Sequence, residues 1–398
     1  MGRDMSAKPR LGVVITELGI PSEVWMVRQC LGFRRVEPVL FAWGERAGAG
    51  DPPALERHLF AAPFPAPEGP WRRLQARAGL ARARLPDAAA RDDIRRTLGG
   101  AGLDGVLCHF LWTAIPVVEA LGGALPVAAQ AHGRDASALL AHADYRAALR
   151  RTLPRLDALA VVGGFQRDLL APFGPPARTA VIPCGAPTAL FAARPLPLRA
   201  PGAPIRFVSV GRLSAEKGVL ESLEAFERVA RAHPAEWTVI GDGPLRGALE
   251  TAVARSPAGA KVRLTGALGP EAVADELSRA HVFVQHSREA GGWIEGFGVT
   301  LTEAGAAGLP RVASAFGGIP DQVTDGRDGL LFPPDDVAAQ AAAMARLAED
   351  EALRRAMGAA ARTRAAEFDS DLMAGRLEDF LIESFTAARA PTPDAAHV

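Results

Sequence analysis

The sequence has few of the residues that crosslink a chain or anchor it in a membrane. Its three cysteines, Cys30, Cys108 and Cys184, are spaced too widely for a disulfide framework or a metal knuckle. We expect them to be small buried hydrophobic residues in a reducing compartment. No run approaches the roughly 18 apolar residues of a membrane span, and the apolar run after the polar N-terminus is too short for a signal peptide. We therefore expect a cytoplasmic protein, with a peripheral position on the inner membrane as the open alternative.

An excess of one charge is also absent. Lys plus Arg and Asp plus Glu number 45 each among 398 residues, so the whole molecule gives no case for a nucleic-acid partner. No His, Cys and carboxylate cluster has metal-ligand spacing, and we expect neither a metal nor a cofactor. The hydrophobic content of 48% is ample for two cores, and the chain is too long for a typical single domain.

Short apolar runs alternate with helix-like stretches along the whole chain. Runs such as 12–16, 105–110, 206–210 and 282–285 are mostly apolar and show no regular alternation with polar residues. This pattern is typical of strands that are covered on both faces, and hence of parallel sheets flanked by helices. The predicted fold class is α/β, with two doubly wound, Rossmann-like domains facing each other across a cleft.

Composition sets the expected domain limits. Residues 1–190 would form an N-terminal domain, and 191–204 a linker rich in Pro and Ala. The strand-helix series restarts at 205, so 205–368 would form a second domain. A C-terminal helix over 369–389 is predicted to pack back toward the first domain, and the tail 390–398 to be disordered.

The first segment with chemical potential follows a predicted strand and opens a helix: Val210-Gly211-Arg212-Leu213-Ser214-Ala215-Glu216-Lys217-Gly218. Glycines allow the backbone to turn tightly and approach a ligand. Arg212 offers a planar set of donors and Lys217 a mobile point charge. Two cations on a strand-to-helix loop suit a diphosphate, whereas the alternative is a glycine turn with two solvated charges.

A second segment combines a glycine turn with two carboxylates seven residues apart: Glu295-Gly296-Phe297-Gly298-Val299-Thr300-Leu301-Thr302-Glu303. A helix is predicted from about 298 to 308, and its first amides favour an anion. Carboxylates beside an anion site suit the hydroxyls of a sugar or a ribose, and a surface glutamate is the alternative for Glu303.

Two further features allow alternative interpretations. His132 follows a predicted strand in Gln130-Ala131-His132-Gly133-Arg134-Asp135, where a ligand of the cleft would lie, although a lone histidine is more often structural. Between 71 and 96 stand eight arginines against three aspartates. They form either a basic surface for anionic lipid or an ordinary solvated face.

These motifs together resemble the GT4-type retaining glycosyltransferases of GT-B fold. The resemblance includes Gly211–Gly218, Glu295 with Glu303, and the segments Ile240-Gly241-Asp242-Gly243-Pro244, Gly317-Gly318-Ile319-Pro320 and Asp325-Gly326. It implies a metal-independent hexosyltransferase with His132, Glu295, Arg212 and Lys217 as catalytic residues. The implied donor-binding residues are Gly19, Gly211, Arg212, Lys217, Gly241, Asp242, Glu295, Gly296, Phe297, Gly298, Val299, Thr300 and Glu303. Glu303 would bind the ribose, Glu295 the donor sugar, and His132 the sugar or reaction centre.

The N-terminal half resembles the subgroup that builds bacterial exopolysaccharides such as colanic acid. The similar segments are Pro21-Ser22-Glu23-Val24-Trp25, Cys108-His109-Phe110 and His132-Gly133-Arg134-Asp135. There are departures from the family pattern. Gly19 stands alone where many members have a glycine pair, Asp321 replaces a glutamate, and Gly291-Gly292-Trp293-Ile294 replaces a more acidic stretch.

The resemblance implies transfer from a nucleotide-sugar to a saccharide or lipid-linked saccharide acceptor, in cell-surface polysaccharide biosynthesis. The domain over 205–368 would be the nucleotide-sugar-binding domain, because it carries the donor motifs, and the domain over 1–190 would be the acceptor-binding domain. A small soluble metabolite as acceptor, and a nucleotide-sugar epimerase or hydrolase on the same fold, remain as alternatives. A non-catalytic binding partner is a further alternative, although such a protein usually loses the two cations and two glutamates that are present here.

Overall fold

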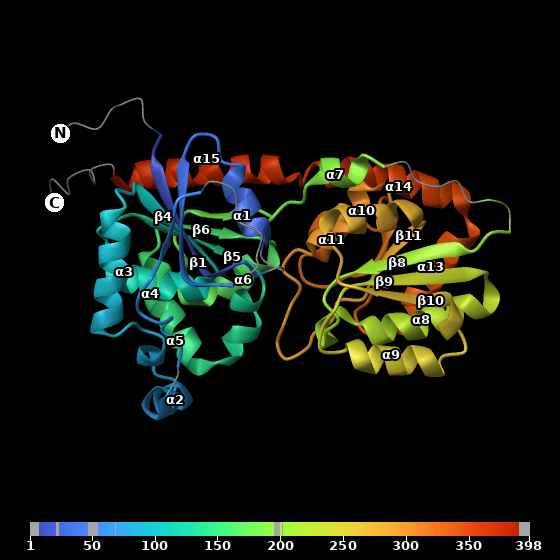
Figure 1. Cartoon of the computed structure of the whole chain (residues 1–398), viewed down its shortest axis with the longest axis horizontal. Coiled ribbons are helices and arrows are strands. Elements are labelled where there is room, and N and C mark those ends of the chain that lie inside the picture. Colours follow the sequence, from blue (N-terminus) through green and yellow to red (C-terminus); the bar gives the residue numbers. More distant parts are fainter. Residues whose placement is uncertain are drawn as a thin grey trace, which may run out of the picture. The chain divides into compact units, whose positions relative to one another are not determined.

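A computed structural model describes residues 8–20, 24–46, 55–67, 69–194, 200 and 202–389. They divide into two compact units, one comprising Met1–Pro183 and Met373–Val398 and the other Cys184–Leu372. Each unit contains one parallel sheet with helices packed against it (Figure 1). The two α/β domains predicted from the apolar runs are thereby confirmed.

The first unit contains a seven-stranded sheet of order β3-β2-β1-β4-β5-β6-β7. The strands are β1 (Arg10–Leu18), β2 (Glu37–Glu45), β3 (Arg57–Leu59), β4 (Gly105–His109), β5 (Val127–Ala131), β6 (Ala158–Val161) and β7 (Thr179–Val181). The helices are α1 (Val24–Leu31), α2 (Gly69–Arg77), α3 (Ala88–Gly100), α4 (Leu111–Leu121), α5 (Ala143–Thr152), α6 (Phe165–Leu170) and α15 (Ser370–Arg389).

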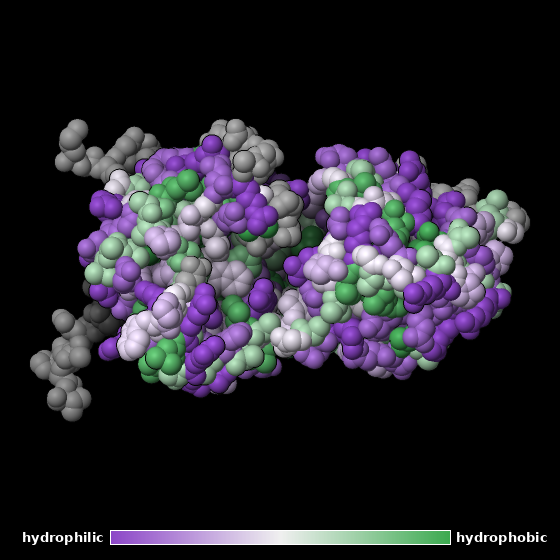
Figure 2. Space-filling model, turned by 60° about the horizontal axis from the view of Figure 1, so that its bottom comes forward, coloured by the Kyte–Doolittle hydropathy of each residue, from purple (hydrophilic) through white to green (hydrophobic). Residues whose placement is uncertain are grey.

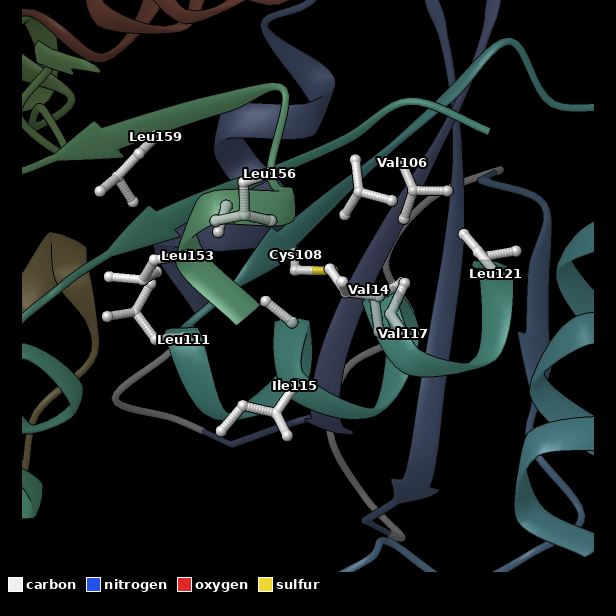
Figure 3. Packing of buried hydrophobic residues seen from close by; sticks show 14 of the residues in the cluster. Val14, Val106, Cys108, Leu111, Ile115, Val117, Leu121, Leu153, Leu156 and Leu159 are labelled. Carbon is white, nitrogen blue, oxygen red and sulfur yellow. The ribbon is translucent and has the colours of Figure 1, made fainter. Parts of the chain in front are cut away.

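Both faces of this sheet are buried, which explains its continuous apolar strands. Val14 packs with Val106, Cys108 and Ile115 in the cluster between the strands and α4 (Figure 3). Its neighbour Val13 belongs to the other cluster, because successive side chains of a strand point to opposite faces. All three cysteines are buried, and no disulfide joins them.

The C-terminal helix α15 completes the second face of this sheet. Phe385 occupies the space where a side chain at position 105 would stand, since a Cβ built on Gly105 would lie 2.4 Å from its ring. The buried Glu378 accepts hydrogen bonds from the backbone N–H groups of Arg34, Arg35 and Val36 at 2.9, 2.6 and 2.9 Å. The first unit is therefore built from both ends of the chain.

The second unit contains a six-stranded parallel sheet of order β10-β9-β8-β11-β12-β13. The strands are β8 (Ile205–Val210), β9 (Ala235–Ile240), β10 (Val262–Gly266), β11 (Val282–Gln285), β12 (Arg311–Ser314) and β13 (Gly329–Phe332). The helices are α7 (Thr188–Ala192), α8 (Val219–Ala232), α9 (Arg246–Arg255), α10 (Pro270–Arg279), α11 (Val299–Ala306), α12 (Ile319–Gln322), α13 (Val337–Glu349) and α14 (Glu351–Ala366).

The expected domain limits need one correction. The linker was predicted to begin at 191, but α7 spans that position and buries Phe191 in the core of the second unit. That unit accordingly begins at Cys184 rather than after 204. Residues 195–199 and 201 of the predicted linker, and the predicted disordered tail 390–398, lie outside the described residues. Across the part of the chain that is described, no helix has both the length and the apolar character of a membrane span.

Candidate active site

Three loops meet beyond the carboxyl ends of β8, β9 and β11. Leu213, after β8, donates its N–H to the carbonyl of Asp242, after β9, at 2.9 Å. Gly241 has φ 141°, and a Cβ there would lie 1.9 Å from the carbonyl oxygen of Gly211. Only glycine permits this close approach of two backbones. Gly218, with φ 55°, likewise lies against the His286 carbonyl. Gly241, which was predicted to bind the donor, thus has a steric role in assembling the loops, and Gly218 of the same motif has one as well.

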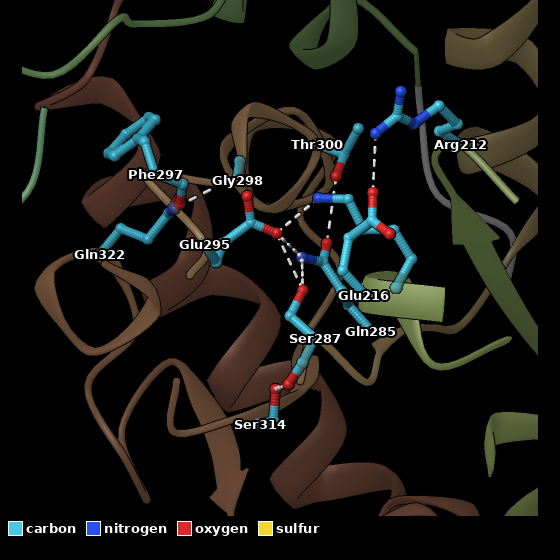
Figure 4. A network of polar contacts seen from close by, with 11 residues as sticks. Arg212, Glu216, Gln285, Ser287, Glu295, Phe297, Gly298, Thr300, Ser314 and Gln322 are labelled. Atoms are coloured by element: carbon cyan, nitrogen blue, oxygen red, sulfur yellow. Dashed lines mark hydrogen bonds and ion pairs between the residues drawn. The ribbon is translucent and has the colours of Figure 1, made fainter. Parts of the chain in front are cut away.

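The centre of this site is an ion pair between Lys217 and Glu295. Lys217 Nζ lies 2.5 Å from Glu295 Oε2. The same carboxylate oxygen accepts hydrogen bonds from Ser287 Oγ at 2.8 Å and Gln285 Nε2 at 3.1 Å (Figure 4). Glu295 is buried, so these three donors are needed to compensate for the removal of its carboxylate from water. The Lys217 ammonium also lies 4.8 Å from the centroid of the Trp293 ring.

Arg212, the second predicted cation, is on the same loop but points elsewhere. Its side chain is 64% exposed, and its guanidinium pairs with Glu216 at 2.7 Å (Figure 4). Arg212, Lys217 and Gln285 nevertheless line one small pocket. An exposed ion pair of this kind is weak, so the guanidinium can leave Glu216 at little cost in free energy.

The glycine turn of the second motif positions Glu295 next to a helix N-terminus. Gly298 has φ 81°, and α11 begins at the next residue, Val299. The segment Gly317-Gly318 supports the turn, since a Cβ on either glycine would lie within 2.2 Å of the carbonyl of Glu295 or Gly296. Thr300 Oγ1 donates to Gln285 Oε1 at 3.2 Å. The amides of residues 299 and 300 therefore start the helix beside the Lys217–Glu295 pair.

Two further carboxylates, Glu303 and Asp242, were predicted to bind the donor in this unit. Glu303 is half-buried on α11, one turn after Val299. Asp242 is exposed. Its Oδ1 accepts the N–H of Gly243 at 2.7 Å, and its Oδ2 lies 3.2 Å from the Arg246 guanidinium. Asp242 therefore stabilises its own loop, and its side chain is occupied in this structure.

In the first unit, two histidines face each other at the ends of neighbouring strands. His109 Nδ1, at the end of β4, lies 3.1 Å from His132 Nε2, just after β5. Both side chains are buried, and burial lowers the pKa of His109 to about 3 and that of His132 well below its usual value. The Trp25 ring contacts both imidazoles edge-on, with centroids 5.7 and 4.6 Å away. Both histidines are therefore neutral at physiological pH.

Asp135 joins the loops that carry these histidines. Its Oδ1 accepts the backbone N–H groups of His132 and Gly133, both at 3.0 Å, and its Oδ2 accepts that of Leu111 at 2.9 Å. Complete burial raises the pKa of this carboxyl. Gly19, the other donor residue predicted in this unit, forms the turn after β1 with φ 80°. The neighbouring motif residues 21–23 lie outside the described residues.

Sequence reasoning did not assign several residues of these networks. Gln285 is the last residue of the buried strand β11 and Ser287 follows it, and this position marks them as candidates for a site. His109 and Asp135 belong to segments already noted as similar to the subgroup. Trp293 gives no such signal, because its position over Lys217 depends on a turn at Gly291 and Gly292, whose φ angles are 61° and 77°.

Both halves of the chain match known protein families. Residues 28–190 match "Glycosyltransferase Family 4", and residues 197–364 match "Glycosyl transferases group 1". A GDP-mannose-dependent alpha-(1-6)-phosphatidylinositol monomannoside mannosyltransferase of Mycobacterium tuberculosis is 31% identical over 277 residues, which cover 66% of this chain and 70% of that protein. A putative colanic acid biosynthesis glycosyltransferase, WcaL of Salmonella typhimurium, is 30% identical over 217 residues. This match covers 54% of the chain and about half of the relative, 53%.

Solved structures share the fold over most of the chain. Anabaena Alr3699/HepE in complex with UDP aligns with a TM-score of 0.73 at 15% identity, over 94% of this chain and 100% of that one. At this identity the likeness concerns the fold alone. It is the GT-B fold expected from the sequence.

Proposed function

The chain belongs to the family 4 glycosyltransferases, and from this premise we propose that it transfers a hexosyl group from a nucleoside diphosphate sugar to a saccharide or lipid-linked saccharide. The observation that carries the proposal is the buried Glu295 carboxylate, held by Lys217 and Ser287 beside the N-terminus of α11. This combines a cation, helix amides and a hydroxyl acceptor, as a charged diphosphate joined to a sugar requires. The similarity to the putative colanic acid biosynthesis glycosyltransferase WcaL supports a role in building a bacterial surface polysaccharide.

In the proposed reaction, Lys217, Arg212 and the amides near Gly298 bind the diphosphate. The bond between the sugar C1 and the phosphate oxygen breaks, and a bond from the acceptor hydroxyl oxygen to C1 forms. The acceptor proton passes to the departing phosphate oxygen, on the same face of the sugar, so that the anomeric configuration is retained. Cations and helix amides stabilise the charge that grows on the leaving group, and no metal is required in this scheme.

The other groups bind the two ends of the donor. We assign Glu295 to hydroxyls of the donor sugar and Glu303 to the nucleotide ribose, and His132 to the donor sugar or the reaction centre, as the family resemblance implies. Gly211, Gly241 and Gly296 bring backbone rather than side chains to the donor. The first unit would bind the acceptor, because the donor motifs gather in the second.

For the acceptor, α2 supports contact of the first unit with an anionic membrane. Trp71 and Leu74 of this helix are 69% and 56% exposed, beside the exposed Arg73 and Arg77. Figure 2 shows the side of the molecule on which α2 lies in Figure 1, with apolar residues among hydrophilic ones. Exposed Trp and Leu next to Arg are typical of helices that lie in a membrane interface.

The basic surface is smaller than the eight arginines suggest. Four of them are engaged within the protein: Arg72 with the carbonyls of residues 83 and 85, Arg84 with Asp144, Arg95 with Asp92, and Arg96 with Asp93. Arg73, Arg77 and Arg82 form no ion pair with any described residue. The proposed lipid contact therefore centres on α2 and the turn after it rather than on the whole range 72–96.

A screen of nucleotide-sugars by thermal stabilisation tests the proposal, since a ligand that binds the folded state must raise the melting temperature. UDP-, GDP- and ADP-sugars are compared with the free nucleotides. We expect one nucleotide-sugar to stabilise the protein more than the others, and sugars that carry a different base to have little effect. Release of free sugar without an acceptor would favour a hydrolase, and an inverted linkage in the product, measured by NMR, would contradict retention.

A further inference from the structure

The strongest unexplained feature of the first unit is the second buried histidine. His132 has a proposed role at the donor, whereas His109 has none, although it lies 3.1 Å away and is even more deeply buried. A buried polar side chain costs free energy unless it forms hydrogen bonds. Here one ring nitrogen of His109 faces His132, and the other, Nε2, meets no hydrogen-bond partner among the described residues.

This unpartnered nitrogen determines where the protons are. Between two neutral imidazoles, only one of the facing nitrogens carries a hydrogen. If His132 donated, His109 Nε2 would carry a buried N–H without an acceptor, and an unpaired buried donor is rarer and more costly than an unpaired acceptor. The favoured arrangement is therefore His109 Nδ1–H donating to His132 Nε2. The proton of the His132 ring is then on Nδ1.

The surroundings hold the His132 ring in this pose. Phe110, between β4 and α4, has φ 69°, which is strained for a residue with a side chain. From that conformation its ring meets the His132 ring edge-on at 4.8 Å, while Trp25 contacts it from another direction at 4.6 Å. Gln166 Nε2 binds the His132 carbonyl at 3.0 Å. Strain that persists at one residue is a reason to look for function there.

We propose that His109 is a positioning residue, which fixes the ring and the tautomer of His132 so that it presents an N–H at Nδ1 to the donor sugar. The proposal rests on the proposed role of His132, and it goes beyond that role by assigning the proton and the residue that controls it. A hydrogen-bond donor at this place suits a sugar hydroxyl or a ring oxygen. In the purely structural alternative, His109 only fills space in the core, and the protonation of its ring nitrogens has no effect on His132.

The first test needs no substrate. Long-range proton–nitrogen NMR on protein labelled at histidine nitrogens distinguishes the two tautomers of each ring, with His109→Asn and His132→Gln spectra for assignment. We expect both His109 and His132 in the form protonated at Nδ1. A His109 ring protonated at Nε2 would overturn the proposal without bearing on the glycosyltransferase function.

The second test compares two variants with the donor found in the thermal screen. His109→Asn keeps an N–H donor near the Nδ1 position, whereas His109→Leu keeps the volume and loses the donor. We expect the Leu variant to lower kcat by about 10- to 100-fold, as observed for partners that orient metal-binding histidines, with KM for the donor little changed and His132 shifted toward the Nε2-protonated form. The Asn variant should restore most of the activity. Equal kcat in both folded variants and wild type would show that His109 only fills space.

Discussion

Lys217 Nζ lies 2.5 Å from Glu295 Oε2, so that the cation proposed for the diphosphate is paired with the carboxylate proposed for the sugar. The diphosphate and Glu295 therefore compete for one ammonium group. When a complete donor is present, Glu295 can bind sugar hydroxyls instead, but with the nucleoside diphosphate alone it has no such partner.

This competition predicts opposite effects of Glu295→Gln on product and donor. Loss of the negative charge should strengthen binding of the nucleoside diphosphate by about fivefold, or roughly 1 kcal/mol, while turnover of the nucleotide-sugar falls. Calorimetry with UDP, GDP and ADP measures the first effect. Glu224→Gln removes the same charge from the exposed surface of α8 and serves as control. Weaker product binding in the Glu295 variant would show that the two groups do not compete.

Lys217→Ala should lower turnover strongly. The ammonium stabilises charge that develops on the leaving diphosphate, and the loss of one such contact costs about 2.7–4 kcal/mol, or 10²–10³-fold in kcat. The measurement is the steady-state rate with the identified donor. Lys261→Ala, whose ammonium binds the carbonyl of Ala230, is the matched lysine outside the site. A near-normal rate for Lys217→Ala would refute the assignment.

Glu303→Gln should weaken nucleotide binding more than it changes the choice of sugar. A carboxylate that accepts from two ribose hydroxyls loses one charged acceptor on conversion to the amide, a change worth about 1.5–3 kcal/mol. Calorimetric titration with the nucleoside diphosphate measures this directly, with Glu250→Gln on α9 for comparison. Unchanged affinity would remove Glu303 from the ribose site.

The buried histidine pair predicts a loss of stability in mild acid. Burial lowers the pKa of His109 to about 3 and that of His132 well below its usual value, so the unfolded chain binds more protons than the folded one below about pH 6.5. Their contribution to stability is complete above pH 7 and is lost as the pH falls. Each histidine that stays neutral in the folded protein should lower the free energy of unfolding by about 2 kcal/mol between pH 7 and pH 5.

The check on this pH dependence is urea unfolding of wild type and His109→Asn at both pH values. The carboxylates, including Asp135 beside the pair, are common to the two proteins, so their contributions cancel in the comparison. The variant should lose about 2 kcal/mol less than wild type on acidification. Equal losses would mean that His109 is protonated in the folded protein.

Binding to anionic vesicles should depend on α2. Each basic residue near such a surface contributes about 1 kcal/mol, and salt screens it. Co-sedimentation with vesicles of phosphatidylglycerol should be measurable at low salt and fade as salt rises. Arg73→Gln with Arg77→Gln should reduce it, whereas Arg228→Gln on α8 should not. If wild type fails to sediment at low salt, a soluble acceptor becomes the better interpretation.

Much of the fold was predictable because its signals are local. The run at 12–16 has apolar residues at both odd and even positions of the strand, and the structure buries Val13 and Val14 on opposite faces of the sheet. Asp369 stands just before the C-terminal helix that was predicted from 369, and its Oδ1 accepts the N–H of Asp371 at the start of α15. In contrast, α7 was missed, because its five residues are too few for a helical period to appear.

The contacts within the site could not be predicted from the sequence. The resemblance indicated Lys217 and Glu295 but not their pairing, which depends on loops that follow different strands, 78 residues apart. Arg212 was expected to face the diphosphate, yet its guanidinium pairs with Glu216, which stands four residues later in the same segment. Such choices depend on distances between side chains, which a motif does not contain.

The hydrogen bonds from the backbone of residues 34–36 to Glu378 have a consequence for the synthesis of the protein. The carboxylate lies more than 340 residues after the amides that it binds, so the N-terminal sheet stays open on one face until α15 has left the ribosome. The second unit, whose chain is continuous, can close earlier during translation. A protein that stops before α15 would expose the apolar face around Val13 and Leu107, and it would become a substrate for chaperones or for aggregation.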